Sequence, residues 1–455
     1  MAVMWRRLSV EQALIWSILG GYLLLPPLPV GFNLPVVPDL NKNSIPALTA
    51  LAIMLFSRRE KLNVLPDSLI GRGLILIFVM SPFATVLTNG EELPKGANDT
   101  IQGMRIYDSV AAVTNQMIDV LPFFLARHYL AGPEAMRLLV AALVLAGLGY
   151  SVPMLLETQI APVINIWVYG FFQHDFFQMI RAGGYRPIVF LPHGLWVAFF
   201  ALMAAMAALV TFRVGPAPER PKQALILVYL LMVLVACKSA GPMIFALALT
   251  PLILFAPRRV QILVAAGLAV IVMTYPLLRG AHLIPVDRII ATAFQFSPDR
   301  AWSFQFRVMN EERLLDWAQL KPFFGWGGYG RNLLYDPESG ITLTIVDGAW
   351  ILVLGVYGWA GYIAQFGLLV LPLVLMGREM LAPQREAPSP FLAAICLILA
   401  ANLLDLLPNG TLVPLTWLMA GAVLGQAERM RRMRVLQRAT DLQATLHPRN
   451  RKTVI

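Results

Sequence analysis

The chain is organised around one polar stretch: it begins Trp302-Ser-Phe-Gln-Phe-Arg307, continues as Lys321-Pro-Phe-Phe-Gly-Trp-Gly-Gly-Tyr-Gly330 and closes with Val346-Asp-Gly-Ala-Trp350. The apolar run 351–361, predicted to be helical, follows directly. Arginine, carboxylate, aromatic and glycine residues are concentrated in this stretch, whereas most of the remaining sequence is apolar. We therefore expect the chain's polar chemistry to be located here.

The composition predicts a helical membrane protein. Of its 455 residues 58% are hydrophobic, and its mean hydropathy is +0.67. Soluble proteins average about 45–50% apolar residues, and repeated runs of roughly 20 apolar residues are long enough to cross a bilayer. We predict an all-α, polytopic fold with about 12 transmembrane helices. Cys237 and Cys396 lie within apolar runs, which indicates neither a disulfide framework nor a zinc site.

The net charge of +10 is explained mainly by the C-terminal tail. Residues 427–455 hold eight Lys or Arg residues against Glu428 and Asp441, which leaves +6 in the tail alone. Basic residues beside a final membrane span are held on the cytoplasmic side and attracted to anionic lipid. The charge therefore favours a topology signal over nucleic-acid binding, and with the other charged flanks it predicts that both termini are cytoplasmic.

The alternation of apolar runs and charged flanks divides the chain into four parts. We predict nine transmembrane helices in residues 1–278, a large periplasmic loop in 279–346, three further transmembrane helices in 347–426 and a basic cytoplasmic tail in 427–455. Within the first part, the two apolar segments on either side of Lys238 have about 16 residues each, which corresponds to roughly 24 Å of helix.

Within the large loop, residues 304–320 contain no proline or glycine and predict a helix. Arg307 and Glu311 share one face of that helix at i, i+4 spacing. The glycines in 325–330 permit a tight turn and close approach to a ligand, but no Gly-Lys-Ser/Thr follows, so the stretch is not a P-loop. Because the sequence also lacks the common metal-site, serine-nucleophile and Walker motifs, it leaves a metal-independent enzyme or a protein without enzymatic activity.

The combination of motifs resembles the bacterial O-antigen ligase and polysaccharide polymerase superfamily. The matching pieces are Gly184-Tyr-Arg-Pro-Ile-Val-Phe-Leu-Pro-His193-Gly, Lys238-Ser-Ala-Gly, Ser303-Phe-Gln-Phe-Arg307, Lys321-Pro-Phe-Phe-Gly-Trp-Gly-Gly-Tyr-Gly330, Asp347-Gly-Ala-Trp-Ile351 and Gly355-Val-Tyr-Gly-Trp-Ala-Gly361. With the predicted spans, the resemblance covers about residues 184–407. The glycine–tryptophan motif is moderately specific in this context and weak alone.

The resemblance implies glycosyl transfer from an undecaprenyl-diphosphate-linked glycan at the periplasmic face of the bacterial inner membrane. It implies an architecture similar to C-type glycosyltransferases, with no nucleotide sugar, cofactor or metal. Arginines would hold the diphosphate while a base activates the acceptor hydroxyl. The implied partners are the lipid-linked glycan, membrane lipid, a chain-length regulator and a flippase, with no nucleic acid.

One departure from the family pattern favours a polymerase over a ligase. Ligases of the family place a histidine near the start of the span after the large loop, whereas this chain has Asp347 there. Polymerases of the family often have an acidic residue at that position. The main expectation is therefore a polymerase of oligosaccharide repeats, and the alternative within the enzyme class is a ligase that transfers glycan to a lipid or protein acceptor.

Three residues are the candidate catalytic groups. Arg307 and Arg186 would neutralise the leaving diphosphate, a role that suits a guanidinium; the alternatives are a structural pair of Arg307 with Glu311, or interfacial anchoring. Asp347 would be the general base, or only the N-cap of the next helix. The candidate substrate-binding residues are Arg181, His193, Lys238, Glu311, Trp326, Gly327, Tyr329 and Arg331.

Structural roles remain open for several of these side chains. His193 fits a packed polar core, Lys238 fits a lysine that reaches the outer surface, and the tryptophans fit packing. From another class of protein, a secondary transporter or lipid-carrier flippase also has many spans. Two observations disfavour it: the halves show no matched broken helices, and the polar residues lie outside the membrane's midplane.

The charge pattern predicts the topology directly. Reporter fusions at Gly90, Asn165 and Tyr335 should read as periplasmic, and fusions at Arg59, Arg220 and Arg378 as cytoplasmic, because basic flanks are retained inside. Paired phosphatase and fluorescent-protein fusions at each position would measure this. A cytoplasmic signal at Tyr335 would contradict the periplasmic location of the polar stretch.

Overall fold

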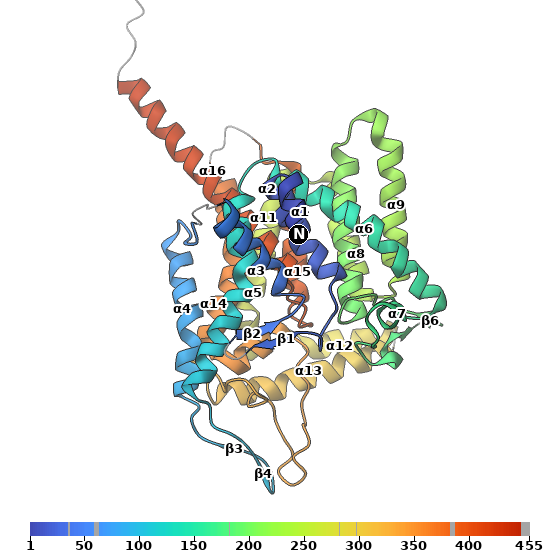
Figure 1. Cartoon of the computed structure of the whole chain (residues 1–455), viewed down its shortest axis with the longest axis vertical. Helices are drawn as coiled ribbons and strands as arrows, with labels where there is room; N and C mark the ends of the chain where they lie inside the picture. The colour runs from blue at the N-terminus through green and yellow to red at the C-terminus, as the bar shows by residue number, and fades with distance from the viewer. Residues whose placement is uncertain are drawn as a thin grey trace, which may run out of the picture.

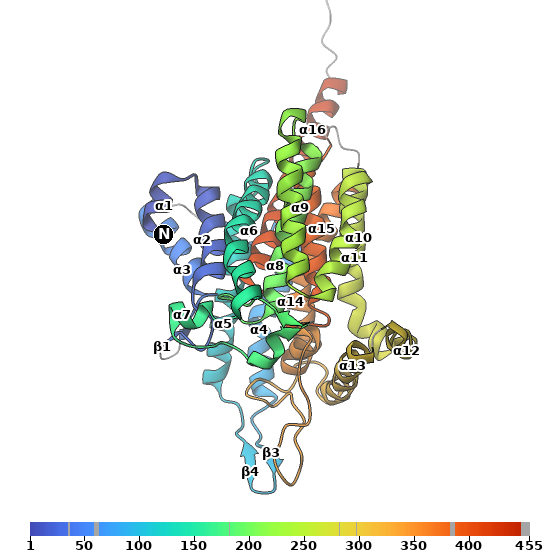
Figure 2. The ribbon, with the colours of Figure 1, turned by 90° about the vertical axis from the view of Figure 1, so that its right-hand side faces the viewer.

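A computed structural model of the chain describes residues 1–34, 37–58, 63–181, 183–281, 283–296, 298–382 and 387–446. Within these ranges the chain is mainly helical with little strand, and most helices stand side by side in one bundle (Figures 1 and 2). The strands of the described part form three small two-stranded antiparallel sheets. The predicted all-α class is confirmed.

The helices of the bundle have similar directions along its long axis. They are α2 (Val10–Leu24), α3 (Ile45–Ala52), α4 (Leu69–Leu87), α5 (Ile106–Tyr129), α6 (Ala135–Ile160), α8 (Gly194–Val214), α9 (Arg220–Ala236), α10 (Ala240–Phe255), α11 (Arg258–Gly280), α14 (Ala349–Leu381), α15 (Pro390–Asp405) and α16 (Pro414–Leu446). The helices outside it are α1 (Ala2–Arg7), α7 (Ile164–Tyr169), α12 (Val286–Phe296) and α13 (Pro298–Gln319). The sheets pair β1 (Phe32–Leu34) with β2 (Val37–Leu40), β3 (Leu93–Gly96) with β4 (Asp99–Ile101), and β5 (Ile180–Arg181) with β6 (Gly184–Tyr185).

The structure does not support the predicted count of twelve spans. Of the described helices, six are long and apolar enough to cross a membrane, namely α4, α5, α6, α8, α11 and α14. The apolar helices α2, α10 and α15 have only 15 or 16 residues. A helix of that length spans roughly 24 Å, less than the roughly 30 Å of a hydrocarbon core. The two short legs expected around Lys238 are present as α9 and α10, of 17 and 16 residues.

Two element boundaries refine the predicted division of the chain. The apolar run that follows Arg186 forms helix α8 only from Gly194 onward, so residues 186–193 form an irregular segment with a turn and bends. The tail expected after Gln426 continues α16 without a break to Leu446. Its residues 447–455, and the fusion position Arg59, lie outside the described residues.

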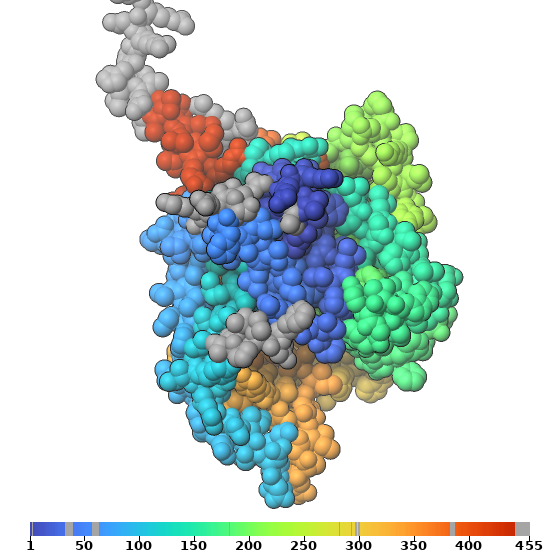
Figure 3. Space-filling model, in the orientation of Figure 1, coloured from blue at the N-terminus to red at the C-terminus, as the bar shows by residue number. Residues whose placement is uncertain are grey.

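The polar elements gather at one end of the bundle, which we call the α13 end. Helices α12 and α13 lie across this end, and the β3–β4 hairpin projects from it beside the loop 331–346 (Figures 1–3). A small apolar cluster of Val286, Ile290 and Val308 joins α12 to α13. At the opposite end, the α16 end, the C-terminal half of α16 extends away from the bundle (Figure 1). The stretch singled out in the sequence therefore forms much of the α13 end.

Helix α14 is interrupted where the sequence predicted a continuous helix. Gly358 has φ +63° and ψ −163°, a conformation open essentially to glycine alone. The loop after α13 pairs with the backbone groups around the break: the N–H groups of Trp326 and Gly327 donate to the carbonyls of Gly355 and Val356 at 2.8 and 2.9 Å. In the other direction the Trp359 N–H donates to Pro322 O at 2.8 Å. The glycines were expected to allow close approach to a ligand. In the structure they allow the loop to approach the backbone of α14.

We expect Gly358→Ala to destabilise the protein by about 3 kcal/mol or more. The backbone conformation alone costs a non-glycine residue roughly 1–3 kcal/mol, and a Cβ at this position would lie 2.5 Å from the carbonyl carbon of Phe323. Thermal unfolding in detergent would measure the loss. Gly73→Ala in α4 is the matched control: a Cβ there meets nothing within 4 Å, so the change should be neutral or slightly stabilising. Equal melting temperatures for the two variants would contradict this account of the break.

Candidate functional site

A cavity of about 620 Å³ opens at the α13 end of the bundle. Three parts of the chain line it: the segment from Gln178 to Leu195, the turn between α9 and α10, and the N-terminal half of α13. Five of its lining side chains are basic, namely Arg181, Arg186, His193, Lys238 and Arg307. All five were candidate site residues from the sequence. The structure therefore brings together residues that are up to 126 positions apart in the chain.

Arg186 is buried at the floor of this cavity. Its Nη2 donates to Ser239 Oγ at 2.5 Å, while its Nε has no hydrogen-bond partner. Burial, with smaller effects from Arg181 and Arg307, lowers the pKa of Arg186 to about 10, so the guanidinium remains charged at neutral pH. Among the described residues no carboxylate forms an ion pair with it. A buried cation is costly without a partner, so this cavity favours an anionic ligand.

Lys238 and Arg181 add positive charge at the rim. Lys238 lies in the turn between α9 and α10 with φ +51°. Its Nζ donates to the Arg181 carbonyl at 3.0 Å, which joins this turn to the β5–β6 hairpin. No carboxylate in the described part of the chain forms an ion pair with either side chain. Lys238, for which the sequence left a position at the outer surface open, lies in the lining of the basic cavity.

His193 is the N-cap residue of α8. Its Nδ1 accepts the Leu195 N–H at 3.0 Å, which assigns the proton of the neutral ring to Nε2. Burial and the neighbouring Arg186 lower the pKa of His193 to about 3. The imidazole is therefore neutral at physiological pH, and its Nε2–H is a hydrogen-bond donor. Because its Nδ1 lone pair is already engaged, His193 is poorly placed to act as a base.

Arg307 links the cavity to Asp347. Its Nε lies 3.5 Å from Asp347 Oδ2, and its Nη1 donates to Asn409 Oδ1 at 3.1 Å. Both members of the ion pair are about one-third exposed, so they are accessible to a ligand. The structural alternative predicted a pair of Arg307 with Glu311. In the structure Arg307 pairs with Asp347 instead. Asn409 is fixed in turn by its amide, which donates to Asp405 Oδ1 at 2.9 Å.

Asp347 is not the N-cap of α14. Gly348 occupies that position with extended backbone angles, and no side chain makes the capping hydrogen bond. The capping alternative is therefore wrong: the chain turns into the helix one residue later than the pattern predicted, which leaves the Asp347 carboxylate free to pair with Arg307. The role of Asp347 as a base stays a prediction.

Glu311 lies one turn beyond Arg307 on α13 and is buried. Burial is the largest cause that raises its pKa, to about 7, and the nearby Asp347 adds to the shift, whereas Arg279 and Arg307 oppose it. Its neighbour Glu312 pairs with the buried Arg279 at 2.8 Å. Glu311 does not line the cavity, so its position fits a packed, partly protonated carboxyl group beside the site.

The four candidates in the glycine–tryptophan motif do not line the cavity. Trp326 stacks on Trp317 with ring centroids 4.2 Å apart, and its indole N–H donates to Trp317 O at 2.7 Å. Arg331 is buried and donates to Trp326 O and Gln102 O. Gly327 lies against Met104, where a Cβ would come within 2.1 Å of the sulfur.

The fourth, Tyr329, is exposed and contacts Asp108 through its hydroxyl at 3.2 Å. These contacts join the glycine loop to the segment between α4 and α5. The structure therefore gives Trp326, Gly327 and Arg331 clear structural contacts, while a role for them in substrate binding stays a prediction.

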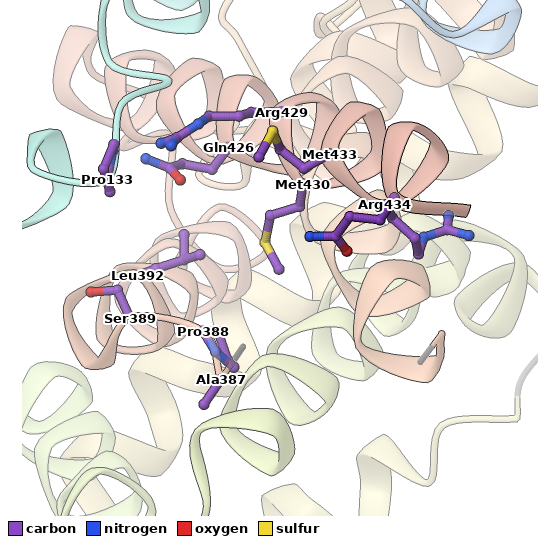
Figure 4. A pocket seen from close by; sticks show the side chains of 11 residues that line it. Pro133, Ala387, Pro388, Ser389, Leu392, Gln426, Arg429, Met430, Met433 and Arg434 are labelled. Carbon is purple, nitrogen blue, oxygen red and sulfur yellow. The ribbon is translucent and has the colours of Figure 1, made fainter. Parts of the chain in front are cut away.

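A second cavity, at the α16 end, has a different character (Figure 4). It measures about 310 Å³ and lies between α16 and the start of α15. The labelled side chains include Arg429 and Arg434 beside Met430 and Met433 (Figure 4). Both Nε and Nη2 of Arg434 donate to the Glu379 carboxylate at 2.8 Å, so this charge is already neutralised. The cavity at the α13 end is therefore the stronger candidate for an anionic ligand.

Several residues of the site escaped sequence reasoning. Ser239 follows Lys238 in the quoted Lys-Ser-Ala-Gly motif, so the motif was a usable signal. Phe304 likewise lies within the quoted motif that ends at Arg307. Asn409 and the lining residue Gln178 carried no signal, because their place in the site depends on tertiary packing.

Comparison of the sequence with protein-family models and with proteins of curated function gives no match. Among the described residues, no three histidine, cysteine, aspartate or glutamate side chains cluster closely enough to hold a metal ion. Inferences about function therefore depend on the geometry of the cavity.

The raised pKa of Glu311 predicts a pH-dependent stability. A carboxyl with a folded pKa near 7 and an ordinary value of 4.5 binds its proton more tightly in the folded state. The resulting stabilisation is complete below pH 4.5 and is lost as pH rises through 7. We expect the melting temperature in detergent to fall more steeply over this window for the wild type than for Glu311→Gln. Glu338→Gln, at an exposed loop position, is the control, and identical slopes for all three proteins would contradict the prediction.

Proposed function

We propose that this chain is a membrane glycosyltransferase that polymerises polyprenyl-diphosphate-linked oligosaccharide repeats. The observation that carries the proposal is the cavity in which Arg181, Arg186 and Lys238 gather, with no carboxylate of the described residues paired to them, next to the Arg307–Asp347 pair. A diphosphate supplies the negative charge that such a cavity lacks. The resemblance of the same motifs to the polymerase superfamily supports the choice of reaction.

The residues suggest a division of labour in one displacement step. The acceptor hydroxyl oxygen attacks the anomeric carbon, the bond from that carbon to the diphosphate oxygen breaks, and Asp347 takes the hydroxyl proton. Negative charge grows on the departing diphosphate, where Arg186, Lys238 and Arg307 stabilise it. The Nε2–H of His193 is a further donor on the same wall. No redox partner or nucleotide sugar is needed for this balance.

Arg307 suits its place between the leaving group and the base. Its guanidinium lies beside the Asp347 carboxylate, with Nε 3.5 Å from Oδ2. The same guanidinium lines the cavity. As the diphosphate gains charge and Asp347 loses it, the attraction of Arg307 shifts toward the leaving group.

A ligase would use the same donor cavity with a different acceptor, and Asp347 is the feature that ranks the polymerase first. The transporter alternative is weakened by the broken helix α14. In transporters, broken helices present free backbone groups to the substrate, whereas here the loop 322–327 binds the groups around Gly358.

The proposal carries a location and partners. The chain is proposed to lie in the bacterial inner membrane, with several membrane-spanning helices, both termini in the cytoplasm and the α13 end in the periplasm. Its substrate would be an undecaprenyl-diphosphate-linked glycan, and a flippase and a chain-length regulator would be its functional partners.

Arg307→Ala should lower turnover by on the order of 10²–10³, as expected when a group that stabilises developing charge is removed. Binding of the substrate should weaken less, because the contact strengthens in the transition state. Arg307→Lys should recover only part of the rate, since it keeps the charge but not the planar fork. Polymer formation from purified lipid-linked repeats, followed by gel electrophoresis, measures these rates.

Arg313→Ala is the matched control, because Arg313 is an exposed arginine on the same helix. A folded Arg307→Ala protein with unchanged rate would remove Arg307 from the mechanism. Asp347→Asn tests the base separately, and full activity in that variant would contradict the proposed proton transfer. In cells lacking the protein, single capped repeats indicate a polymerase, whereas unattached polymer indicates a ligase.

A further inference from the structure

The segment from Arg186 to His193 presents two cavity residues, one at each of its ends. It connects β6 to α8 as an irregular segment with a turn at 189–190 and bends at 191–193, and both Arg186 and His193 line the cavity. Near its middle, Val189 has φ +48°, a left-handed conformation that is rare for a β-branched residue. Such strain persists only where surrounding contacts over-determine it, so the contacts of this segment bear on the site.

Glu157, near the C-terminal end of α6, binds the backbone of this segment at its strained residue. Its Oε2 accepts the N–H groups of Ile188 and Val189, both at 2.8 Å. Its Oε1 accepts the Ile164 N–H at 3.0 Å. The residue is fully buried, and in the described part of the chain no arginine or lysine forms an ion pair with it. The partners of this buried carboxyl group are therefore backbone N–H groups, two from the strained segment and one from the start of α7.

Lys42 lies against the next residue of the same segment. Its buried Nζ donates to the Phe190 carbonyl at 2.6 Å, while the Phe190 N–H donates to the Tyr150 hydroxyl at 3.1 Å. The Gln173 amide donates to the carbonyls of Val189 and Leu191 at 2.8 and 3.1 Å. The polar backbone groups at the centre of the segment are thus engaged by four side chains from three separate parts of the chain, two of them from α6.

We propose that Glu157 and Lys42 are positioning residues, which hold the 186–193 segment in its strained form so that Arg186 and His193 face one cavity. The inference rests on the proposed diphosphate-binding function of that cavity. A buried acid that binds N–H groups and a buried base that binds a carbonyl stabilise one conformation of the segment, because each charge would lose its hydrogen-bond partner in any other. Neither residue touches the cavity, so both act through Arg186 and His193.

Binding of a short prenyl diphosphate tests this directly. The full chain in detergent is titrated with farnesyl diphosphate by calorimetry, and its melting temperature is measured in parallel. Both oxygens of Glu157 accept backbone N–H groups. Glu157→Gln keeps one of these oxygens and replaces the other with an NH₂ group, which faces a backbone N–H, so the segment should shift. We expect the Kd to rise roughly tenfold to hundredfold, the effect of misplacing a binding group by about 1 Å.

A double-mutant cycle separates positioning from general stability. Arg186→Lys should weaken binding on its own, and adding Glu157→Gln should then cost much less than it does in the wild type, because its effect passes through Arg186. Independent, multiplicative effects would overturn the inference, as would a Glu157→Gln protein with a lower melting temperature and an unchanged Kd. Glu134→Gln, at the other end of α6, controls for loss of a carboxylate.

A gentler pair of variants covers the case in which Glu157→Gln fails to fold. Tyr150→Phe removes one hydroxyl that contacts the segment, whereas Tyr229→Phe removes a hydroxyl that contacts Ser151 instead, at 2.8 Å. Only Tyr150→Phe should raise the Kd, and equal Kd values would overturn the inference. A wild type that does not bind farnesyl diphosphate would overturn the proposed function and this inference with it. A wild type that binds, with unaffected Glu157→Gln and Tyr150→Phe variants, would overturn the inference alone.

Discussion

The site depends on the backbone pairing between the loop after α13 and the break in α14. A helix interrupted beside an apolar bundle must satisfy its freed backbone groups from within the protein, and residues 322–327 do this around Gly358. The pairing fixes the C-terminal end of α13 against the second and third turns of α14. Asp347 lies two residues before α14 and Arg307 lies on α13, so the two elements joined by this pairing also carry the Arg307–Asp347 ion pair. The glycines of the motif serve this approach, because a Cβ at Gly325 or Gly358 would lie 2.6 Å or less from backbone atoms of the other segment.

Sequence reasoning was most successful where a single local property determines the outcome. Apolar runs predicted an all-α protein, and the helix around Arg307 was expected nearly in full. It also singled out five basic residues that prove to line one cavity, although the resemblance to a family supplied that grouping. It failed where tertiary contacts decide: the break at Gly358 resembles an ordinary helical glycine, and Trp326 and Arg331 looked ligand-directed although Trp317 and Gln102 engage them. Span number was overestimated because several apolar runs form helices too short to cross alone.

Arginine residues at the α16 end and in the candidate cavity have different partners. At the α16 end, Arg127 pairs with Glu428 at 2.8 Å and Arg434 pairs with Glu379, so arginine joins α5, α14 and α16 through buried or partly buried ion pairs. At the α13 end, Arg181, Arg186 and Lys238 have no such carboxylates among the described residues. Arginine therefore stabilises the fold through ion pairs at the α16 end, whereas Arg181 and Arg186 leave charge without a carboxylate in the cavity. Net charge alone, which is dominated by the tail, could not distinguish the two.

Two groups of elements, each with its own supporting contacts, form the cavity. The 186–193 segment is fixed by Glu157 and Lys42, and the α9–α10 turn is joined to it through Ser239 and Arg186. Arg307 instead belongs to α13, which is fixed through α14 and paired with Asp347. An anion that contacts both Arg186 and Arg307 would thus link two otherwise independent supports, and part of its binding energy would be used to set the distance between them. Because Asp347 pairs with Arg307, the ligand's charge and the position of the base are coupled through one guanidinium.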